Sequence, residues 1–178
     1  MGLFSFLKEI KAAYKQISKY MNMSYDDLCL LSDDELKEAI SIRMTGAERH
    51  LEVEECVSTF EGAKKIYYIV NYFDMEVQNG GLCQYSVNSS RLTAPYILDS
   101  LQKIGAISYY QLLSNFINQN NIHLDDLDSF IIEDIDEFEM QTKRYPFDNF
   151  DNAYYELYEK EPLENLLFEY SKHNLKDF

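Results

Sequence analysis

Apolar residues recur along most of the chain at intervals of three and four, the spacing that places them on one face of an α-helix. Residues 1–23 show it most regularly and are expected to form an amphipathic helix. Its apolar stripe has the a/d spacing of a coiled coil and consists of Leu3, Leu7, Ile10, Tyr14, Ile17 and Met21. Two interpretations stay open: the stripe packs on the core of its own chain, which we favour, or it is the seam of a dimer.

Residues 24–178 are expected to form one all-α domain, so that the whole chain has about eight helices. Ser32 and Glu35 have the spacing of a capping box, and Pro95 suits the first turn of a helix that Gly105 ends. Pro162 is expected to start the last helix. No segment alternates with period two over a useful length. Apolar residues at helical spacing predict further helices within 66–77, 97–104, 112–117, 127–138, 148–159 and 163–170.

The composition supports a folded, acidic protein. The 178 residues include only six Gly and three Pro, which favours long helices over a turn-rich β fold. Asp and Glu number 31 against 16 Lys and Arg, a formal net charge of −15, yet 46% of the residues are hydrophobic, which argues against disorder. The charge disfavours direct binding to nucleic acid or to an anionic membrane.

The sequence shows no signal for a membrane span, for secretion or for a disulfide framework. No apolar run approaches the ~20 residues of a membrane-spanning helix, and the N-terminus lacks the features of a secretory signal. Three cysteines are an odd number for a disulfide framework. We therefore expect a cytoplasmic protein with reduced thiols and no membrane partner.

Motifs that carry enzyme chemistry are missing from the sequence. It contains no P-loop, GxGxxG, GxSxG or HExxH pattern. The acid-rich segment that begins at Asp125 lacks the central glycine of a calcium-binding loop. We therefore expect no catalytic residue, no metal site and no cofactor, and a protein that is not an enzyme.

Negative charge is concentrated in the C-terminal third. Residues 125–161 contain 13 acids and only three basic residues, and like charges four residues apart destabilise an isolated helix. Either this is a solvated face that keeps the protein soluble, or it meets a basic protein such as a DNA-binding regulator, a nucleoid protein or a toxin. The acids that are candidates to face such a partner are Asp125, Asp126, Asp128, Glu133, Asp134, Asp136, Glu137 and Glu139.

Residues 76–88, EVQNGGLCQYSVN, resemble the ExxNGG-aromatic-x-Q-aromatic-xxN signature of the bacterial DNA-mimic-protein family. The run FDNFDNAYY at 147–155 and Ile104-Gly105-Ala106 also resemble that family, and the resemblance covers roughly residues 60–175. Two positions depart from the family pattern: Leu82 stands where an aromatic is preferred, and Ser86 where a second aromatic is common. The matching motif residues are Glu76, Asn79, Gly80, Gly81, Gln84 and Asn88.

The resemblance implies an all-α fold, a homodimer and no catalysis. For some family members it also implies an acidic surface that occupies DNA-binding proteins in place of DNA. The partner-binding acids of the family do not fall in this motif, so the resemblance assigns none of them here. We expect the motif to be mainly structural, with residues 79–81 turning the chain at positive φ. Glu76, Gln84 and Asn88 are then expected to bond the exposed backbone ends.

These observations lead to one main hypothesis and two alternatives. The main hypothesis is a non-enzymatic acidic binding protein, a DNA mimic that occupies a basic DNA-binding protein. The first alternative is an immunity protein that neutralises a basic nuclease toxin. The second is a small-ligand or enzymatic site built from Glu76, Asn79 and Gln84.

Overall fold

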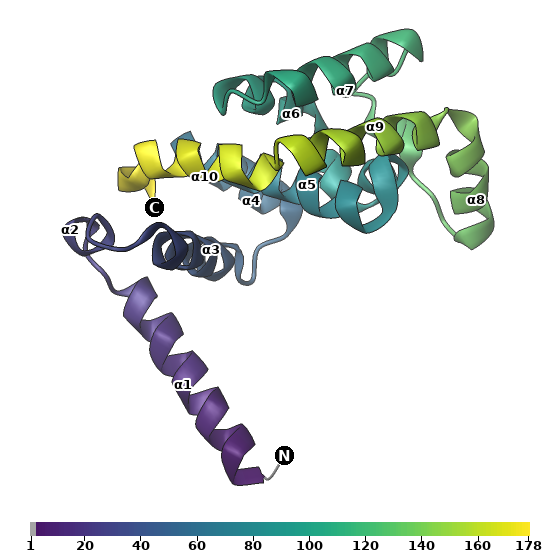
Figure 1. Cartoon of the computed structure of the whole chain (residues 1–178). Helices are drawn as coiled ribbons and strands as arrows, with labels where there is room; N and C mark the ends of the chain where they lie inside the picture. Colours follow the sequence, from purple (N-terminus) through teal and green to yellow (C-terminus); the bar gives the residue numbers. More distant parts are fainter. Residues whose placement is uncertain (1–2) are drawn as a thin grey trace.

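A long, interrupted helix lies at the centre of the protein, and most of the other helices pack against it (Figure 1). The computed structural model describes residues 3–178. In chain order the elements are α1 (Leu3–Met21), α2 (Tyr25–Leu28), α3 (Asp33–Glu48), α4 (Val53–Thr59), α5 (Gly62–Val87), the 3-10 turn η1 (Ser89–Thr93), α6 (Ala94–Lys103), α7 (Ile107–Gln119), the 3-10 turn η2 (Leu127–Phe130), α8 (Ile135–Arg144), α9 (Phe147–Lys160), α10 (Leu163–His173) and the 3-10 turn η3 (Leu175–Asp177).

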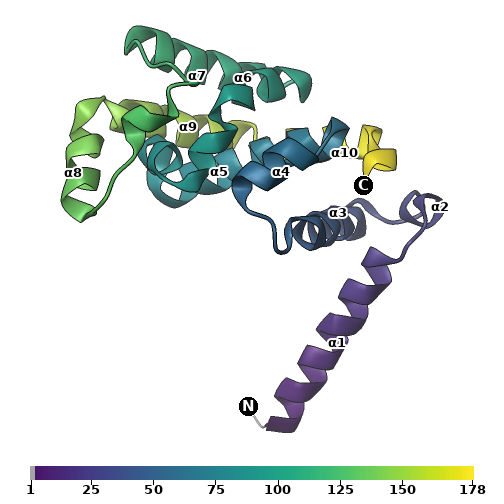
Figure 2. The same cartoon turned by 180° about the vertical axis from the view of Figure 1, so that it is seen from behind.

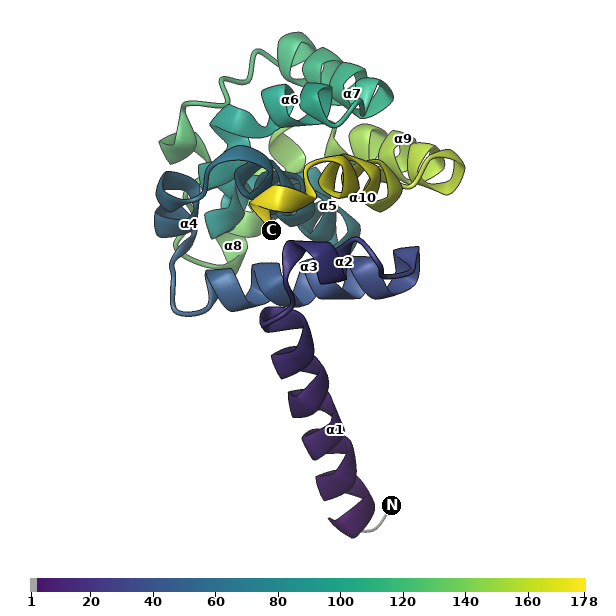
Figure 3. The same ribbon diagram turned by 90° about the vertical axis from the view of Figure 1, so that its left-hand side faces the viewer.

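The central helix α5 is covered on several sides. Helices α4, α6, α9 and α10 contact it, and α8 packs near its far end. Helices α9 and α10 follow one another along the body, which places α8 at one end and α2 at the other (Figures 1 and 2). Helix α1 leaves the body beside α3 and projects away from it in every view (Figure 3). No helix of residues 3–178 has the length and apolar character needed to cross a membrane.

Two groups of buried side chains form the interior. The larger one surrounds α5 and includes Phe73, Tyr85, Leu101 and Tyr154. The smaller one joins α3, α4, the start of α5 and the C-terminus, with side chains such as Ile40, Met44, Cys56 and Tyr68. Since α5 contributes to both groups, it connects the two halves of the body.

The all-α class is confirmed, and residues 3–178 contain no strand. The number of helices is ten in the described part of the chain, rather than about eight. Two short helices that the apolar spacing did not indicate, α2 and α4, account for the excess. The side chains of Leu3, Leu7 and Leu127, which the expectations also name, lie outside the described residues.

The single helix expected over 127–138 is wrong. The chain forms η2, continues in an extended link and starts α8 only at Ile135. Asp134 ends the link because its side chain accepts a hydrogen bond from the backbone N–H of Glu137 at 2.9 Å, as an N-cap does. Phe130 is buried, whereas Ile131 and Ile135 are 50% and 83% exposed, so these apolar residues share no buried face.

The residues predicted to start or end α3, α6 and α10 are confirmed in these roles. Ser32 and Glu35 form the reciprocal hydrogen bonds of a capping box at the start of α3. Pro95 lies in the first turn of α6, and Gly105 follows that helix with φ of 76°. Pro162 precedes α10.

The expectation that the stripe of α1 packs on its own core is wrong. Tyr14 is 69% exposed, and Ile17 and Met21 are each 44% exposed. Among the described side chains of α1, the buried one is Tyr20, which lies off the stripe. The reason is that α1 is attached to the body mainly at its C-terminal turn, beside α3.

Arg43 of α3 makes that attachment. Its Nε donates to the carbonyl of Tyr20 at 2.8 Å and its Nη1 to the carbonyl of Phe178 at 3.0 Å, while Nη2 donates to the carbonyl of Met23. The hydroxyl of Tyr20 donates to Glu38 at 3.2 Å. One guanidinium therefore joins the end of α1, the turn that follows it and the C-terminus.

We predict that Arg43→Met lowers the free energy of unfolding by about 2 kcal/mol, because three backbone carbonyls lose a charged donor. Urea denaturation followed by circular dichroism measures the change. Lys160→Met, which removes an exposed positive charge, is the control and should leave the midpoint nearly unchanged. Equal midpoints for the two variants would contradict the role given to Arg43.

Candidate functional site

The acids singled out in the sequence gather at the α8 end of the body (Figures 1 and 2). They lie in the loop before η2, in η2 itself, in the extended link and in the first half of α8. None of the described residues of α8 is buried. The fold therefore places this segment at the surface, with its charges facing solvent.

The eight acids fall into three groups by their contacts. Asp134 caps α8, and Glu137 accepts a hydrogen bond from the backbone N–H of Glu133 at 2.7 Å, so both serve the helix start. Glu139 forms an ion pair with Lys143 at 2.6 Å. The other five are exposed, and their carboxylates make no hydrogen bond or ion pair with the described residues. These five acids are Asp125, Asp126, Asp128, Glu133 and Asp136.

These five acids belong to a stretch of the sequence that has no Lys or Arg. Residues 104–142 contain eight acids and no Lys or Arg. Arg144, at the end of α8, donates to the carbonyl of Ser129 at 2.7 Å and lies over the rings of Phe130 and Tyr145. The lysines of α1 are carried on a helix that projects from a different part of the body (Figures 1 and 3).

The motif at 76–88 interrupts α5. The backbone leaves helical geometry at Gly80 and at Gly81, and only Gly81 has positive φ, at 78° with ψ of 179°. A side chain at position 81 would also collide with the carboxylate of Asp151. Glycine is required at 81 for both reasons. The expectation of positive φ is thus confirmed for Gly81 and wrong for Asn79 and Gly80.

Helix α9 satisfies the backbone groups that the interruption exposes. Asp151 accepts a hydrogen bond from the backbone N–H of Leu82 at 2.8 Å, at the start of the second half of α5. The hydroxyl of Tyr155 donates to the carbonyl of Val77 at 3.0 Å, at the end of the first half. Both broken ends therefore find their partners on one neighbouring helix.

The polar motif side chains bond one another instead of the backbone, which corrects the sequence expectation. Glu76 Oε2 accepts from Gln84 Nε2 at 2.7 Å and from Asn88 Nδ2 at 2.9 Å. This clasp of three side chains spans the interruption from one half of α5 to the other. A side chain at Gly80 would collide with Gln84, so that glycine makes room for the clasp. Asn79 is exposed beside it.

A buried carboxylate lies two residues before the motif. Asp74 is 8% exposed, and it accepts hydrogen bonds from Gln78 at 2.8 Å and from the hydroxyl of Tyr154. Burial penalises the charged form and raises the pKa of Asp74, although both hydrogen bonds act in the opposite direction. Burial raises the pKa values of Tyr109 and Tyr158, and the negative charge of Asp74 raises them further.

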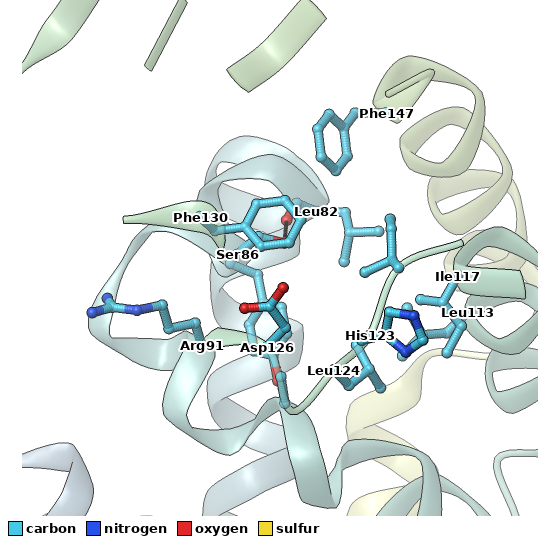
Figure 4. Close-up of a pocket in the computed structure, with 13 residues that line it drawn as sticks. Leu82, Ser86, Arg91, Leu113, Ile117, His123, Leu124, Asp126, Phe130 and Phe147 are labelled. Atoms are coloured by element: carbon cyan, nitrogen blue, oxygen red, sulfur yellow. Dashed lines mark hydrogen bonds between the residues drawn. The ribbon is translucent and has the colours of Figure 1, made fainter. Parts of the chain in front are cut away.

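A small apolar cavity lies beside the motif (Figure 4). Its volume is about 30 Å³, far below the several hundred Å³ of typical ligand pockets. Leu82 and Ser86, the two positions that depart from the family pattern, both line it, together with Phe130 and Phe147. The hydroxyl of Ser86 donates to the carbonyl of Leu82 at 2.8 Å. The cavity is therefore a place where small side chains leave the packing incomplete.

The contacts of Asp74, Asp151, Tyr154 and Tyr155 were not predicted from the sequence. Their signal was present in the run 147–155, whose polar residues at helical spacing lie on the face of α9 that meets α5. Residues 3–178 contain no group of three or more His, Cys, Asp or Glu side chains placed to hold a metal. Burial raises the pKa of the Cys83 thiol to about 11, so this thiol is neutral at pH 7.

We predict that Gly81→Ala lowers stability by about 3 kcal/mol or more, because the new methyl group requires positive φ and displaces Asp151. Gly105→Ala is a matched control: its φ is 76°, but a methyl group there meets no atom within 4 Å. Its cost should stay at about 1–2 kcal/mol. Thermal and urea denaturation compare the two variants, and equal losses would show that the contact with Asp151 contributes nothing.

We predict that Asp74→Asn changes the pH dependence of stability. Because the folded-state pKa is raised above its ordinary value of 3.8, the protonated form contributes stability at low pH that is lost as pH rises through the folded-state pKa. The variant should therefore gain stability relative to the parent protein as pH rises toward 7. Urea denaturation across this pH range measures the difference. For Glu159→Gln, at an exposed position, the free energy of unfolding plotted against pH should run parallel to that of the parent protein. A parallel curve for Asp74→Asn would refute the prediction.

Comparison with known proteins gives one match. No curated protein and no solved structure matches the chain. A family model described as DMP19-like protein matches residues 58–174. This range contains the interrupted part of α5, the α8 end and the part of α9 that closes the interruption. It agrees with the resemblance of residues 76–88, and the chain belongs to the DMP19-like protein family.

Proposed function

We propose that the protein is a non-enzymatic DNA mimic whose α8 end occupies the DNA-binding surface of a basic protein. Membership of the DMP19-like family supports the general class. The five unpaired acids at the α8 end supply negative charge for the Lys and Arg side chains of such a partner. A DNA-binding regulator or a nucleoid protein has the required surface.

Exposed apolar side chains lie among these acids, and they favour an interface with a protein partner over a surface that only contacts solvent. Ile131, Ile135 and Met140 are 50%, 83% and 65% exposed. Ile131 and Met140 line a shallow cleft of about 550 Å³, whose charged lining residues are Glu137, Lys143 and Arg144. A face whose role is solubility has no need of large apolar residues, whereas protein interfaces combine apolar contacts with a polar rim. The mixture therefore supports a protein partner.

Because partner binding would rest on these exposed charges, it should depend on the salt concentration. The five acids are exposed, so mobile ions screen them, and the Debye length falls from ~10 Å at 0.1 M to ~3 Å at 1 M salt. Binding should weaken as salt rises. DNA should displace the protein from its partner, because both occupy the same basic side chains.

We predict that neutralising the five unpaired acids weakens partner binding at least about tenfold, since each exposed ion pair contributes up to about 1 kcal/mol. The variant combines Asp125→Asn, Asp126→Asn, Asp128→Asn, Glu133→Gln and Asp136→Asn. The immobilised protein is exposed to DNA-binding proteins eluted from a DNA-cellulose column, and retained proteins are then eluted with duplex DNA or with salt. Titration with a purified retained protein gives the affinity.

The control removes the same charge elsewhere on the surface. Five exposed acids outside the α8 end are changed together: Asp34→Asn, Glu54→Gln, Glu61→Gln, Glu164→Gln and Glu169→Gln. This variant should keep most of the affinity. Equal loss in both variants would show that only the net charge matters, and retained proteins that DNA does not displace would argue against mimicry.

A further inference from the structure

Helix α1 presents an apolar stripe to solvent while it projects from the body (Figure 3). Tyr14 is 69% exposed, Ile17 and Met21 are each 44% exposed, and Ile10 is partly exposed. These residues follow one another at intervals of four, three and four, so they share one face of the helix. Large apolar side chains gathered on one exposed face indicate an interaction surface.

Four lysines form a second face of the same helix. They recur at intervals of three, four and four, and all are exposed. None of them forms an ion pair with a side chain that the structure describes. At 3.6 residues per turn, the middle of this lysine face lies roughly 135° around the helix from the middle of the apolar stripe. The four residues are Lys8, Lys11, Lys15 and Lys19.

The charge of α1 is opposite to that of the rest of the chain. Residues 1–23 contain four lysines and one glutamate, whereas the remaining residues contain 30 acids and only 12 Lys and Arg. The net charge of −15 disfavours an anionic membrane for the chain as a whole, but it does not describe this segment. At physiological salt the Debye length is ~8 Å, so a surface in contact with α1 responds mainly to the lysines beside it.

The contacts that attach α1 to the body use a third face of the helix. Gln16 donates to Glu38 at 2.6 Å, and the hydroxyl of Tyr20 donates to the same carboxylate at 3.2 Å. Gln16 and Tyr20 are four residues apart, and the face they share lies roughly 110° from both the stripe and the lysines. The stripe and the lysines are therefore available to a binding partner without any loss of these contacts.

From this arrangement we propose that α1 binds the surface of an anionic phospholipid bilayer, with its stripe among the acyl chains and its lysines at the headgroups. Helices that lie in the membrane interface combine a large apolar face with Lys or Arg on the polar face. The aliphatic stems of lysines allow their ammonium groups to reach the headgroups while the apolar face is buried. The helix carries too many lysines to cross the bilayer, so it lies parallel to the surface.

The combination of the two faces favours a lipid surface over other partners. A nucleic acid would pair with the lysines and leave the apolar stripe in water. A bilayer meets both faces at once, because its headgroups carry the negative charge and its acyl chains accept the apolar side chains. The acidic α8 end belongs to a different part of the body (Figures 1 and 3), so it need not contact the lipid.

This inference is independent of the proposed DNA mimicry. Helix α1 lies outside the matched residues 58–174, and the proposed mimicry uses the α8 end. Neutralising the five unpaired acids should leave lipid binding intact, and losing the lysines of α1 should leave the competition with DNA intact. The two proposals therefore fail separately.

Co-sedimentation of the full chain with lipid vesicles tests the proposal. The parent protein should bind vesicles made of equal parts phosphatidylglycerol and phosphatidylcholine, and it should not bind vesicles of phosphatidylcholine alone. Neutralising all four lysines of α1 should weaken binding at least about tenfold, since each lysine near an anionic surface contributes roughly fivefold. This variant combines Lys8→Gln, Lys11→Gln, Lys15→Gln and Lys19→Gln.

The control for this variant removes four exposed lysines from the body and has the same net charge. It combines Lys103→Gln, Lys143→Gln, Lys160→Gln and Lys176→Gln. It should keep most of the affinity for the anionic vesicles, and circular dichroism verifies that both variants keep their helices. Absence of binding by the parent protein, equal binding to both kinds of vesicle, or equal losses in the two variants would each overturn the proposal.

Tryptophan fluorescence tests whether the stripe enters the bilayer. The chain contains no Trp, so Tyr14→Trp provides a single reporter on the stripe. Its emission should shift to shorter wavelength on addition of the anionic vesicles, and lipids with brominated acyl chains should quench it. Leu30→Trp, at a position that is 85% exposed and outside α1, should show neither change. Unchanged emission from Tyr14→Trp would mean that the stripe stays in water or is covered by protein, and this result would overturn the proposal.

Discussion

The interruption of α5 leaves backbone donors and acceptors inside the protein, and a single neighbouring helix supplies their partners. Asp151 bonds the N–H of Leu82, and Tyr155 bonds the carbonyl of Val77. Next to them, Tyr154 donates to the buried Asp74. Each of these groups would be costly to bury without a hydrogen bond. The position of α9 against α5 is thus specified by polar contacts as well as by apolar packing. Because Pro146 and the short link before it join α9 to α8, the same contacts also determine where the acidic end of the body lies.

Local sequence signals predicted local structure well. The capping box at Ser32, the proline starts and Gly105 act within a few residues of themselves, so the sequence contains their whole mechanism. The helix predicted over 127–138 failed for a local reason as well, since Asp134 is a better N-cap than an interior helix residue. Apolar spacing alone did not reveal this, because the spacing continues through the cap.

Contacts between distant residues were harder to predict. Glu76, Gln84 and Asn88 were expected to bond the backbone of the interruption, but these roles belong to Asp151 and Tyr155, about 70 residues further along. The sequence motif marks the interruption, and it does not show which helix packs against it. In the same way, the stripe of α1 indicated an amphipathic helix, and only the arrangement of α3 shows that Tyr14 stays largely exposed while Ile17 and Met21 are partly covered.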